Sequence, residues 1–281
     1  MELQILVLVT FFAAAVNGAV GYGFSSLTVP IALLFFSNKV LNPALVIVAI
    51  ALNGYVLIVN RRSIPVVGKR ILPVLLGVVP GIVCGGLLLA SLNSEWLKFL
   101  TYVSLVPLIL LQAGGVRWPL KSERMVGLLL GGGVGTLYSA TTISGPPMAL
   151  LFNNQGLVQR DFRAAMALLR VAEAVLALFT YYALGLFNAE SLNLSFWVLP
   201  SVLLGVPIGS FLINRVDAES FRRICMSYDA WIVGYGLSRV LVVLQLVATP
   251  AAYTVWLGIA ALDSYLLYVF FTRRRMSQVP A

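Results

Sequence analysis

The chain has 281 residues, of which 60% are hydrophobic and only 10% are charged, and its mean hydropathy is +0.97. An ordinary soluble domain has about 25% charged residues, so this composition excludes a compact soluble fold and predicts a protein whose solvent is lipid. With no histidine and two cysteines, the sequence also excludes a Ser-His-Asp triad, a zinc centre and a disulfide framework.

Eleven apolar segments follow one another along the chain without a soluble domain between them. A membrane-crossing helix needs about 20 apolar residues, so the length allows eight to ten crossings. The fold class predicted is all-α and polytopic. Two segments, 24–37 and 142–155, are short and are expected to be broken by Pro30 and by the Pro146-Pro147 pair, and they either span or re-enter the membrane. The segments are 2–20, 24–37, 40–60, 71–92, 96–115, 125–140, 142–155, 161–186, 195–214, 220–246 and 251–271.

The start of the chain lacks the basic region of a signal peptide, so the first apolar segment is expected to be a permanent helix. The net charge of +9 comes from short basic clusters between the apolar segments, which argues against a nucleic-acid partner. Cytoplasmic loops retain Lys and Arg, so these clusters predict an outer N-terminus and a cytoplasmic C-terminus. The clusters are Arg61, Arg62, Lys69 and Arg70; Arg117, Lys121 and Arg124; Arg160 and Arg163; Arg215, Arg222 and Arg223; and Arg273, Arg274 and Arg275.

Two short matches in the same order indicate an internal repeat. Residues 30–36 match 147–153, with Gly18 aligned on Gly135, and the pentamer 74–78 recurs at 202–206. The halves are 1–116 and 125–246, followed by an additional helix and basic tail over 251–281. The charge assignment starts the first half outside and the second half inside, so the repeats are expected to be inverted.

Inverted repeats with interrupted helices are an architecture of secondary transporters, whose substrate binds near the midplane where the broken segments meet. The stretches 21–30 and 138–147 combine glycine, hydroxyl side chains and proline, and we interpret them as the two halves of such a site. The alternative for any single residue is tight helix packing. The predicted site residues in these stretches are Tyr22, Gly23, Ser25, Ser26, Thr28, Tyr138, Ser139, Thr141, Thr142, Ser144 and Gly145.

Arg170 lies about 15 Å into its helix, close to the midplane, where a charge usually faces a partner or an aqueous pathway. Glu173 is on the same helical face. Either the two form a structural pair, or Arg170 is a fixed counter-charge for an anion while Glu173 orients that anion or takes a proton. Asp229 and Asp263 are further intramembrane groups that could titrate, and Arg239 either pairs with one of them or extends outward.

Nucleotide chemistry has no support in the sequence, because no G-x-x-x-x-G-K-[S/T] loop occurs and the glycine run 131–135 lies inside an apolar segment. We therefore expect no catalytic residue, no metal and no cofactor.

These motifs together resemble the sulfite exporter TauE/SafE family over nearly the whole chain. The resemblance is carried by Gly-Tyr-Gly-Phe at 21–24 leading to Pro30, Gly-Pro-Pro at 145–147, Asp-Phe-Arg-Ala-Ala at 161–165, and 204–209 followed by Phe-Arg-Arg at 221–223. The family is implicated in moving sulfite, sulfonates and related small anions across the bacterial inner membrane. The resemblance implies the same here, with Arg163 as an anion ligand near the cytoplasmic mouth or a basic anchor.

The predicted function is thus a secondary transporter of a small organic or sulfur-containing anion. Its expected partners are that anion, a coupling proton or cation, membrane lipid and a second copy in a homodimer. The alternatives are a passive anion channel, a non-transporting membrane assembly partner and, with few catalytic groups to support it, a membrane-embedded enzyme.

Overall fold

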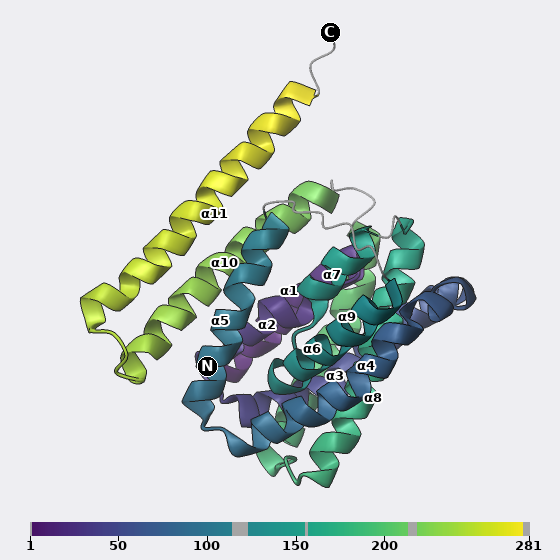
Figure 1. The fold of residues 1–281 in the computed structure, drawn as a ribbon, viewed down its shortest axis with the longest axis horizontal. Coiled ribbons are helices and arrows are strands. Elements are labelled where there is room, and N and C mark those ends of the chain that lie inside the picture. The colour runs from purple at the N-terminus through teal and green to yellow at the C-terminus, as the bar shows by residue number, and fades with distance from the viewer. Residues whose placement is uncertain (1, 114–122, 155–156, 213–217, 278–281) are drawn as a thin grey trace.

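The computed structural model describes residues 2–113, 123–154, 157–212 and 218–277. These residues form eleven α-helices and one short 3-10 helix, and none of them is in a strand (Figure 1). The basic residues Arg117, Lys121 and Arg215 lie outside the described residues. The helices are α1 Glu2–Val20, α2 Phe24–Ala32, α3 Asn38–Val59, η1 Arg61–Ser63, α4 Ile64–Ser91, α5 Ser94–Ala113, α6 Glu123–Thr141, α7 Gly145–Asn154, α8 Gln159–Ala183, α9 Ala189–Leu212, α10 Ala218–Val243 and α11 Thr249–Ser277.

Each of the eleven α-helices corresponds to one of the eleven apolar segments in the sequence, so the predicted all-α fold class is confirmed. Six stretches within the described residues are long and apolar enough to cross a membrane. They are Glu2–Ala19, Asn38–Val59, Arg61–Ser91, Ser94–Leu111, Ala189–Phe211 and Thr249–Thr272.

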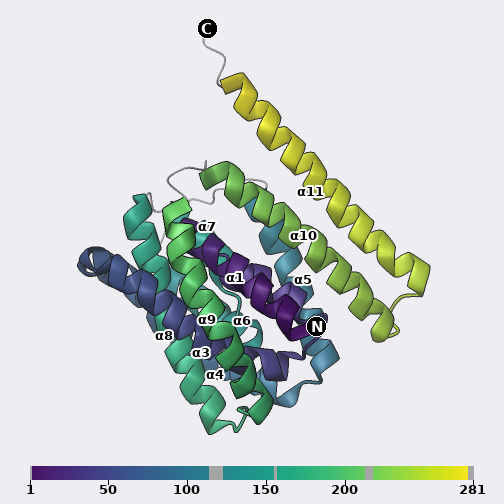
Figure 2. The same cartoon turned by 180° about the vertical axis from the view of Figure 1, so that it is seen from behind.

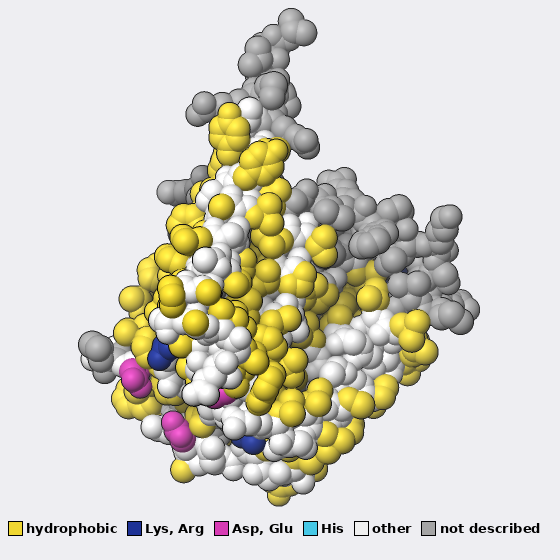
Figure 3. Space-filling view, turned by 60° about the vertical axis from the view of Figure 1, so that its left-hand side comes forward, with side chains coloured by type: hydrophobic (Ala, Val, Ile, Leu, Met, Phe, Trp, Pro, Cys, Tyr) yellow, Lys and Arg dark blue, Asp and Glu magenta, His cyan; other side chains and the backbone are white. Residues whose placement is uncertain are grey.

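The outer surface of the bundle carries large apolar side chains that a soluble protein would bury. Phe196 and Leu129 are each 72% exposed, and both belong to helices of the bundle. In the face seen in Figure 3, hydrophobic side chains cover most of the described surface and the few charged ones gather toward its lower end. Such a surface matches hydrocarbon as its solvent.

Two breaks in the helices separate α1 from α2 and α6 from α7. The first break uses Gly21 and Gly23, whose φ angles are 95° and 114°, a region that glycine enters without steric cost. The second contains Thr142, which holds a φ of 58° despite its branched side chain. Both breaks fall inside the stretches predicted from the sequence, and the helices that follow them have only nine and ten residues.

The sequence assigned the first break to Pro30, and this assignment is wrong, because Pro30 lies inside α2. A proline is tolerated within a membrane helix when the surrounding packing offsets the hydrogen bond it removes, here the bond to the Ser26 carbonyl four residues earlier. Beyond the end of α2 the Leu34 amide bonds to the Ile31 carbonyl, and the Pro30 carbonyl instead accepts a hydrogen bond from the Tyr102 hydroxyl at 3.0 Å. In the second half, Pro146 and Pro147 lie in the first turn of α7, where a missing amide costs nothing.

Helices from the two halves of the chain pack against each other in matching pairs. α1 packs along α9 and α6 packs along α4, while α4 also contacts α8 and α9 contacts α3. α5 lies beside α10 (Figures 1 and 2). Exchanging α1–α5 with α6–α10 maps the first four pairs onto one another and the α5–α10 pair onto itself. A repeat with five helices in each half would produce this arrangement.

Glycines let the α4 and α6 backbones touch. A Cβ atom added to Gly77 would lie 2.0 Å from the Leu128 carbonyl oxygen, and one on Gly81 would lie 2.2 Å from that of Gly132. No larger residue fits at either position without separating the helices, so the two glycines allow close helix packing.

The same close contact recurs between α9 and α1. A Cβ atom on Gly209 would lie 1.8 Å from the Ala15 carbonyl oxygen. Ala15 precedes Gly18 by the same three positions that separate Gly132 from Gly135. The residues matched by the sequence repeat therefore make equivalent contacts in the two halves.

The last helix, α11, lies at the edge of the molecule beside α10 (Figures 1 and 2). A buried ion pair joins the two helices: Arg223 Nη1 lies 3.0 Å from Asp263 Oδ1, and its Nη2 donates to the Asp263 backbone carbonyl at 3.3 Å. This pair gives Asp263 a structural role. It leaves Asp229 as the other buried aspartate of the described residues.

Candidate substrate site

The short helices α2 and α7 contact each other, and their first residues lie close together. A Cβ atom placed on Gly145, the first residue of α7, would be 3.5 Å from Cδ2 of Tyr22, which lies two residues before the start of α2. The amino ends of the two half-helices therefore lie side by side within the bundle, and each carries a partial positive charge of about half a unit. The start of α2 has free backbone amides, whereas Gly145 has the only amide among the first three residues of α7, because Pro146 and Pro147 have no N–H.

Arg170 reaches this junction from the middle of α8. Its Nη2 would lie 2.9 Å from a Cβ on Gly145, so only glycine lets the guanidinium approach the α7 backbone this closely. The guanidinium carbon is 5.9 Å from the centre of the Tyr138 ring, and Arg170 is only 4% exposed. A full positive charge is thus buried beside two helix amino ends, where an anion would stabilise it.

Glu173 lies one turn further along α8 and is fully buried. Its Oε2 accepts a hydrogen bond of 2.6 Å from the hydroxyl of Ser144, the residue just before α7. Its Oε1 has no hydrogen-bond partner. Within the described residues, Arg170 and Glu173 do not form an ion pair within 4 Å. The structural Arg170–Glu173 pair that the sequence offered as an alternative is therefore not formed.

Several other polar atoms close to the two breaks are buried without a hydrogen-bond partner. An unsatisfied buried polar group costs free energy, and native proteins usually satisfy such groups with water or a ligand. Their presence near the buried Arg170 guanidinium indicates a polar interior that binds water or a ligand, and not one filled by apolar packing alone. They include Tyr138 Oη, Ser139 Oγ, Thr28 Oγ1, Asn17 Nδ2 and Asn42 Oδ1.

Side chains from other helices cap the carboxyl end of α6. The Asn42 amide donates to the Ala140 carbonyl at 2.6 Å, and the Tyr181 hydroxyl donates to the Ser139 carbonyl. These carbonyls have lost their helical partners because the chain turns at Thr142. The Thr141 and Thr142 hydroxyls donate to local backbone carbonyls, and the Thr141 oxygen also accepts from the Ile143 amide at 3.2 Å. Both threonines, predicted as site residues, shape the turn.

The carboxyl end of α1 is capped in the same way. Arg163 Nη2 donates to the Gly18 carbonyl at 2.6 Å, and the Ser210 hydroxyl donates to the same oxygen at 3.0 Å. The Arg163 side chain also fills the space beside Gly21, where a Cβ would lie 2.8 Å from its Cγ. Of the two roles implied for Arg163, the geometry favours an anchor of the broken helix.

At the start of α2 the predicted residues lie near a different carboxylate. Ser26 donates to the Gly23 carbonyl at 3.1 Å and also interacts with the Asp229 side chain of α10. Ser25 is buried beside it. Asp229, only 5% exposed, lies near the start of α2, just as Glu173 lies near the start of α7. Each half-helix therefore begins close to a buried acidic side chain from a neighbouring long helix.

The structure thus brings six of the predicted residues together at the junction: Tyr22, Tyr138, Ser144, Gly145, Arg170 and Glu173. Arg163, Thr141 and Thr142 instead make hydrogen bonds that support the two breaks. Sequence reasoning missed Asn42, Tyr181 and Ser210. No local signal could have found them, because each acts on a carbonyl of another helix far along the chain.

The fold and the polar junction define a multi-pass helical membrane protein with a buried polar site. The family model "Sulfite exporter TauE/SafE" matches residues 6–233, and the chain belongs to this family. Membership places it among membrane transporters of the anion and sulfite-export type. No curated protein and no solved structure matches the chain.

Proposed function

We propose that the protein is a secondary transporter that moves a small organic or sulfur-containing anion, such as sulfite or a sulfonate, across the bacterial inner membrane. The substrate binds near the midplane, between the amino ends of α2 and α7. One observation carries this proposal: the buried Arg170 guanidinium lies against the first residue of α7 without an ion-pairing carboxylate among the described residues.

The chemistry of the junction suits an oxyanion better than a cation or a neutral solute. Arg170 supplies a full charge and planar donors, and the helix amino ends add the backbone amides at the start of α2 and that of Gly145 in α7. The hydroxyl of Tyr138 has no hydrogen-bond partner and is available to the same guest. A sulfite or sulfonate headgroup offers three acceptor oxygens, enough for several of these donors at once.

The matching helix pairs support transport by alternating access. If α1–α5 and α6–α10 are inverted repeats, the glycine contacts hold α1 on α9 and α4 on α6 as two rigid pairs, each with one helix from either half. Rocking of such units around a fixed central site is a common transport mechanism. The basic clusters favour an outer N-terminus and a cytoplasmic C-terminus.

The test is exchange of labelled sulfite and taurine in proteoliposomes containing the full chain. Arg170→Gln keeps a planar polar side chain and removes the charge, so we expect the apparent affinity for the anion to fall by about tenfold or more. Arg160→Gln is the matched control, because Arg160 is an exposed arginine of the same helix. Its exchange should equal that of the wild type.

Equal affinity and rate for Arg170→Gln and wild type, with every anion that the wild type carries, would contradict the proposed site. Saturable counterflow distinguishes the carrier from an anion channel, since a channel passes labelled substrate without exchange. Absence of flux for all anions would favour the assembly-partner role.

A further inference from the structure

A second pocket, separate from the central junction, lies at the carboxyl end of α2. It has a volume of about 130 Å³ and is bounded by α2, α5 and α10. Its walls combine aliphatic side chains with three charged groups and one tyrosine. The lining residues are Leu33, Leu34, Glu95, Lys98, Tyr102, Gly236, Arg239, Val240 and Val243.

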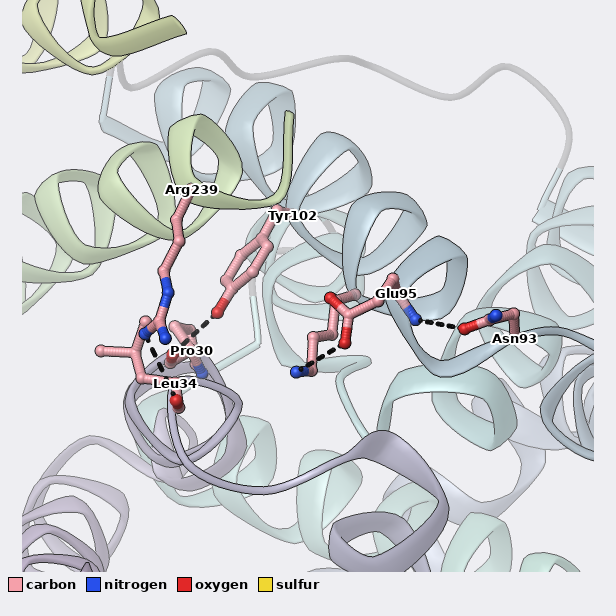
Figure 4. A network of polar contacts seen from close by, with 7 residues as sticks. Pro30, Leu34, Asn93, Glu95, Tyr102 and Arg239 are labelled. Atoms are coloured by element: carbon pink, nitrogen blue, oxygen red, sulfur yellow. Dashed lines mark hydrogen bonds and ion pairs between the residues drawn. The ribbon is translucent and has the colours of Figure 1, made fainter. Parts of the chain in front are cut away.

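The charges in this pocket leave one positive charge uncompensated. Lys98 Nζ lies 3.2 Å from Glu95 Oε1, so this carboxylate offsets one of the two positive charges of the pocket and leaves Lys98 with further donors. Arg239 instead donates to the backbone carbonyl of Leu34 at a long 3.4 Å, and no carboxylate of the described residues lies within 4 Å of it. Figure 4 shows the Arg239 side chain extending from α10 toward the last turn of α2, beside Tyr102.

We propose that this pocket binds a small organic anion that carries a compact apolar group. The acidic headgroup pairs with Arg239 and Lys98, and the apolar group lies against Val240 and Val243. A cation is disfavoured by the excess positive charge, and a bare inorganic anion would leave the aliphatic wall unused. The inference rests on the proposed function, and it gives the transported anion a second site on the path between the centre and one face.

The position of the pocket also connects it to the central site. α2 begins at the junction with α7 and ends at this pocket. Tyr102 donates to the Pro30 carbonyl within α2, and Arg239 donates to the Leu34 carbonyl in the turn just after it. An anion competes with the neutral Leu34 carbonyl for Arg239, because a charged acceptor makes the stronger bond. Binding in the pocket therefore removes one of the two restraints on the outer turn of the half-helix.

The test uses the full chain in phosphatidylcholine nanodiscs and 2,2,2-trifluoroethanesulfonate as a ¹⁹F NMR probe. We expect two bound probes per wild-type chain. Arg239→Gln should weaken one of them by about tenfold or more, the loss of one charge-assisted contact. The matched control is Lys39→Gln, which removes a cation that likewise donates to a backbone carbonyl, that of Ala90 at 3.2 Å, but lies away from the pocket. It should retain both sites.

Two further variants separate this inference from the central site. Lys98→Gln should weaken the same probe as Arg239→Gln, and it tests the pocket if the arginine variant does not fold. Arg170→Gln should remove only the other probe. Two sites retained in both Arg239→Gln and Lys98→Gln would overturn the pocket while leaving the central site intact. If Arg170→Gln still binds two probes while Arg239→Gln and Lys98→Gln each lose one, the central site is overturned and the pocket stands.

An anionic lipid headgroup shares the oxyanion chemistry and is distinguished in the same experiment. Adding phosphatidylglycerol to the nanodiscs should leave the probe bound, because a pocket of about 130 Å³ holds a small headgroup and little more. Displacement of the Arg239-dependent probe by a few percent of this lipid would instead assign the pocket to lipid and overturn the proposal.

Discussion

Ser144 donates a hydrogen bond to Glu173 across 2.6 Å, and this bond ties the start of α7 to the middle of α8. The Ser144 hydroxyl thus donates its hydrogen bond to a buried carboxylate. Among the described residues, the other oxygen of that carboxylate has no hydrogen-bond partner. A carboxylate oxygen without a partner, close to the Arg170 guanidinium and the proposed anion site, is the place where a coupling proton or cation would bind.

We predict that Glu173→Gln uncouples transport from its driving gradient. The amide retains the shape and accepts the Ser144 hydroxyl, but it cannot take up and release a proton. Exchange of labelled anion at equal concentrations should persist, whereas accumulation driven by an imposed pH gradient should be lost. Both are measured in the same proteoliposomes, with the exposed Glu190→Gln as the control. Undiminished accumulation by Glu173→Gln would remove this residue from the coupling step.

The glycine contact between α4 and α6 makes a prediction about stability. Gly81→Ala places a methyl group against the Gly132 carbonyl, so the helices must separate, and we expect a loss of about 1–3 kcal/mol in the free energy of unfolding. Gly68→Ala in the same helix meets nothing within 4 Å and should be neutral or slightly stabilising. Thermal unfolding in detergent measures both. Equal melting temperatures for the two variants would contradict the close contact.

The sequence predicted the order of the helices, the two breaks and the residue types at the junction. These follow from local properties: apolar runs longer than a bilayer, and glycine or hydroxyl clusters that interrupt them. The first break was misplaced at Pro30 because proline breaks helices by local propensity, whereas packing within a membrane protein tolerates it. The break lies instead at Gly21 and Gly23, which adopt positive φ angles.

The supporting contacts of the site could not be predicted from local sequence patterns either. Arg163 was assigned from its motif, but its hydrogen bond to Gly18 depends on how α8 packs against α1. The role of Asp229 beside Ser26 likewise depends on the packing of α10 on α2. A single sequence identifies which polar groups are costly to bury, whereas tertiary packing decides which of them meet.

Arg163 is expected to act on stability and on the geometry of the first break. Removing its side chain by Arg163→Ala leaves the Gly18 carbonyl with Ser210 alone and a void beside Gly21, and we expect a loss of about 1–3 kcal/mol. Arg163→Lys should recover part of this loss, because a lysine can still donate to the carbonyl. The exposed Arg160→Ala serves as the control for charge.

Thermal unfolding and substrate affinity are measured together on these Arg163 variants. The anchor role predicts that Arg163→Lys recovers melting temperature and affinity in parallel. A variant with wild-type melting temperature and strongly weakened anion binding would instead make Arg163 a direct substrate ligand.

The proposed inverted repeat predicts the side of the membrane on which two equivalent residues lie. Ser37 immediately precedes α3 and Val158 immediately precedes α8, the third helix of each half, and Val158 is 66% exposed. In a background with Cys84 and Cys225 replaced by serine, Ser37→Cys should react with a membrane-impermeant maleimide on intact cells. Val158→Cys should react only after the membrane is opened. The reason is the charge bias, since the Arg160 and Arg163 cluster beside Val158 is retained in the cytoplasm. Labelling of both cysteines from the outside would mean that the halves run in the same direction. Transport by rocking of the α1–α9 and α4–α6 pairs around a central anion would then have no structural basis.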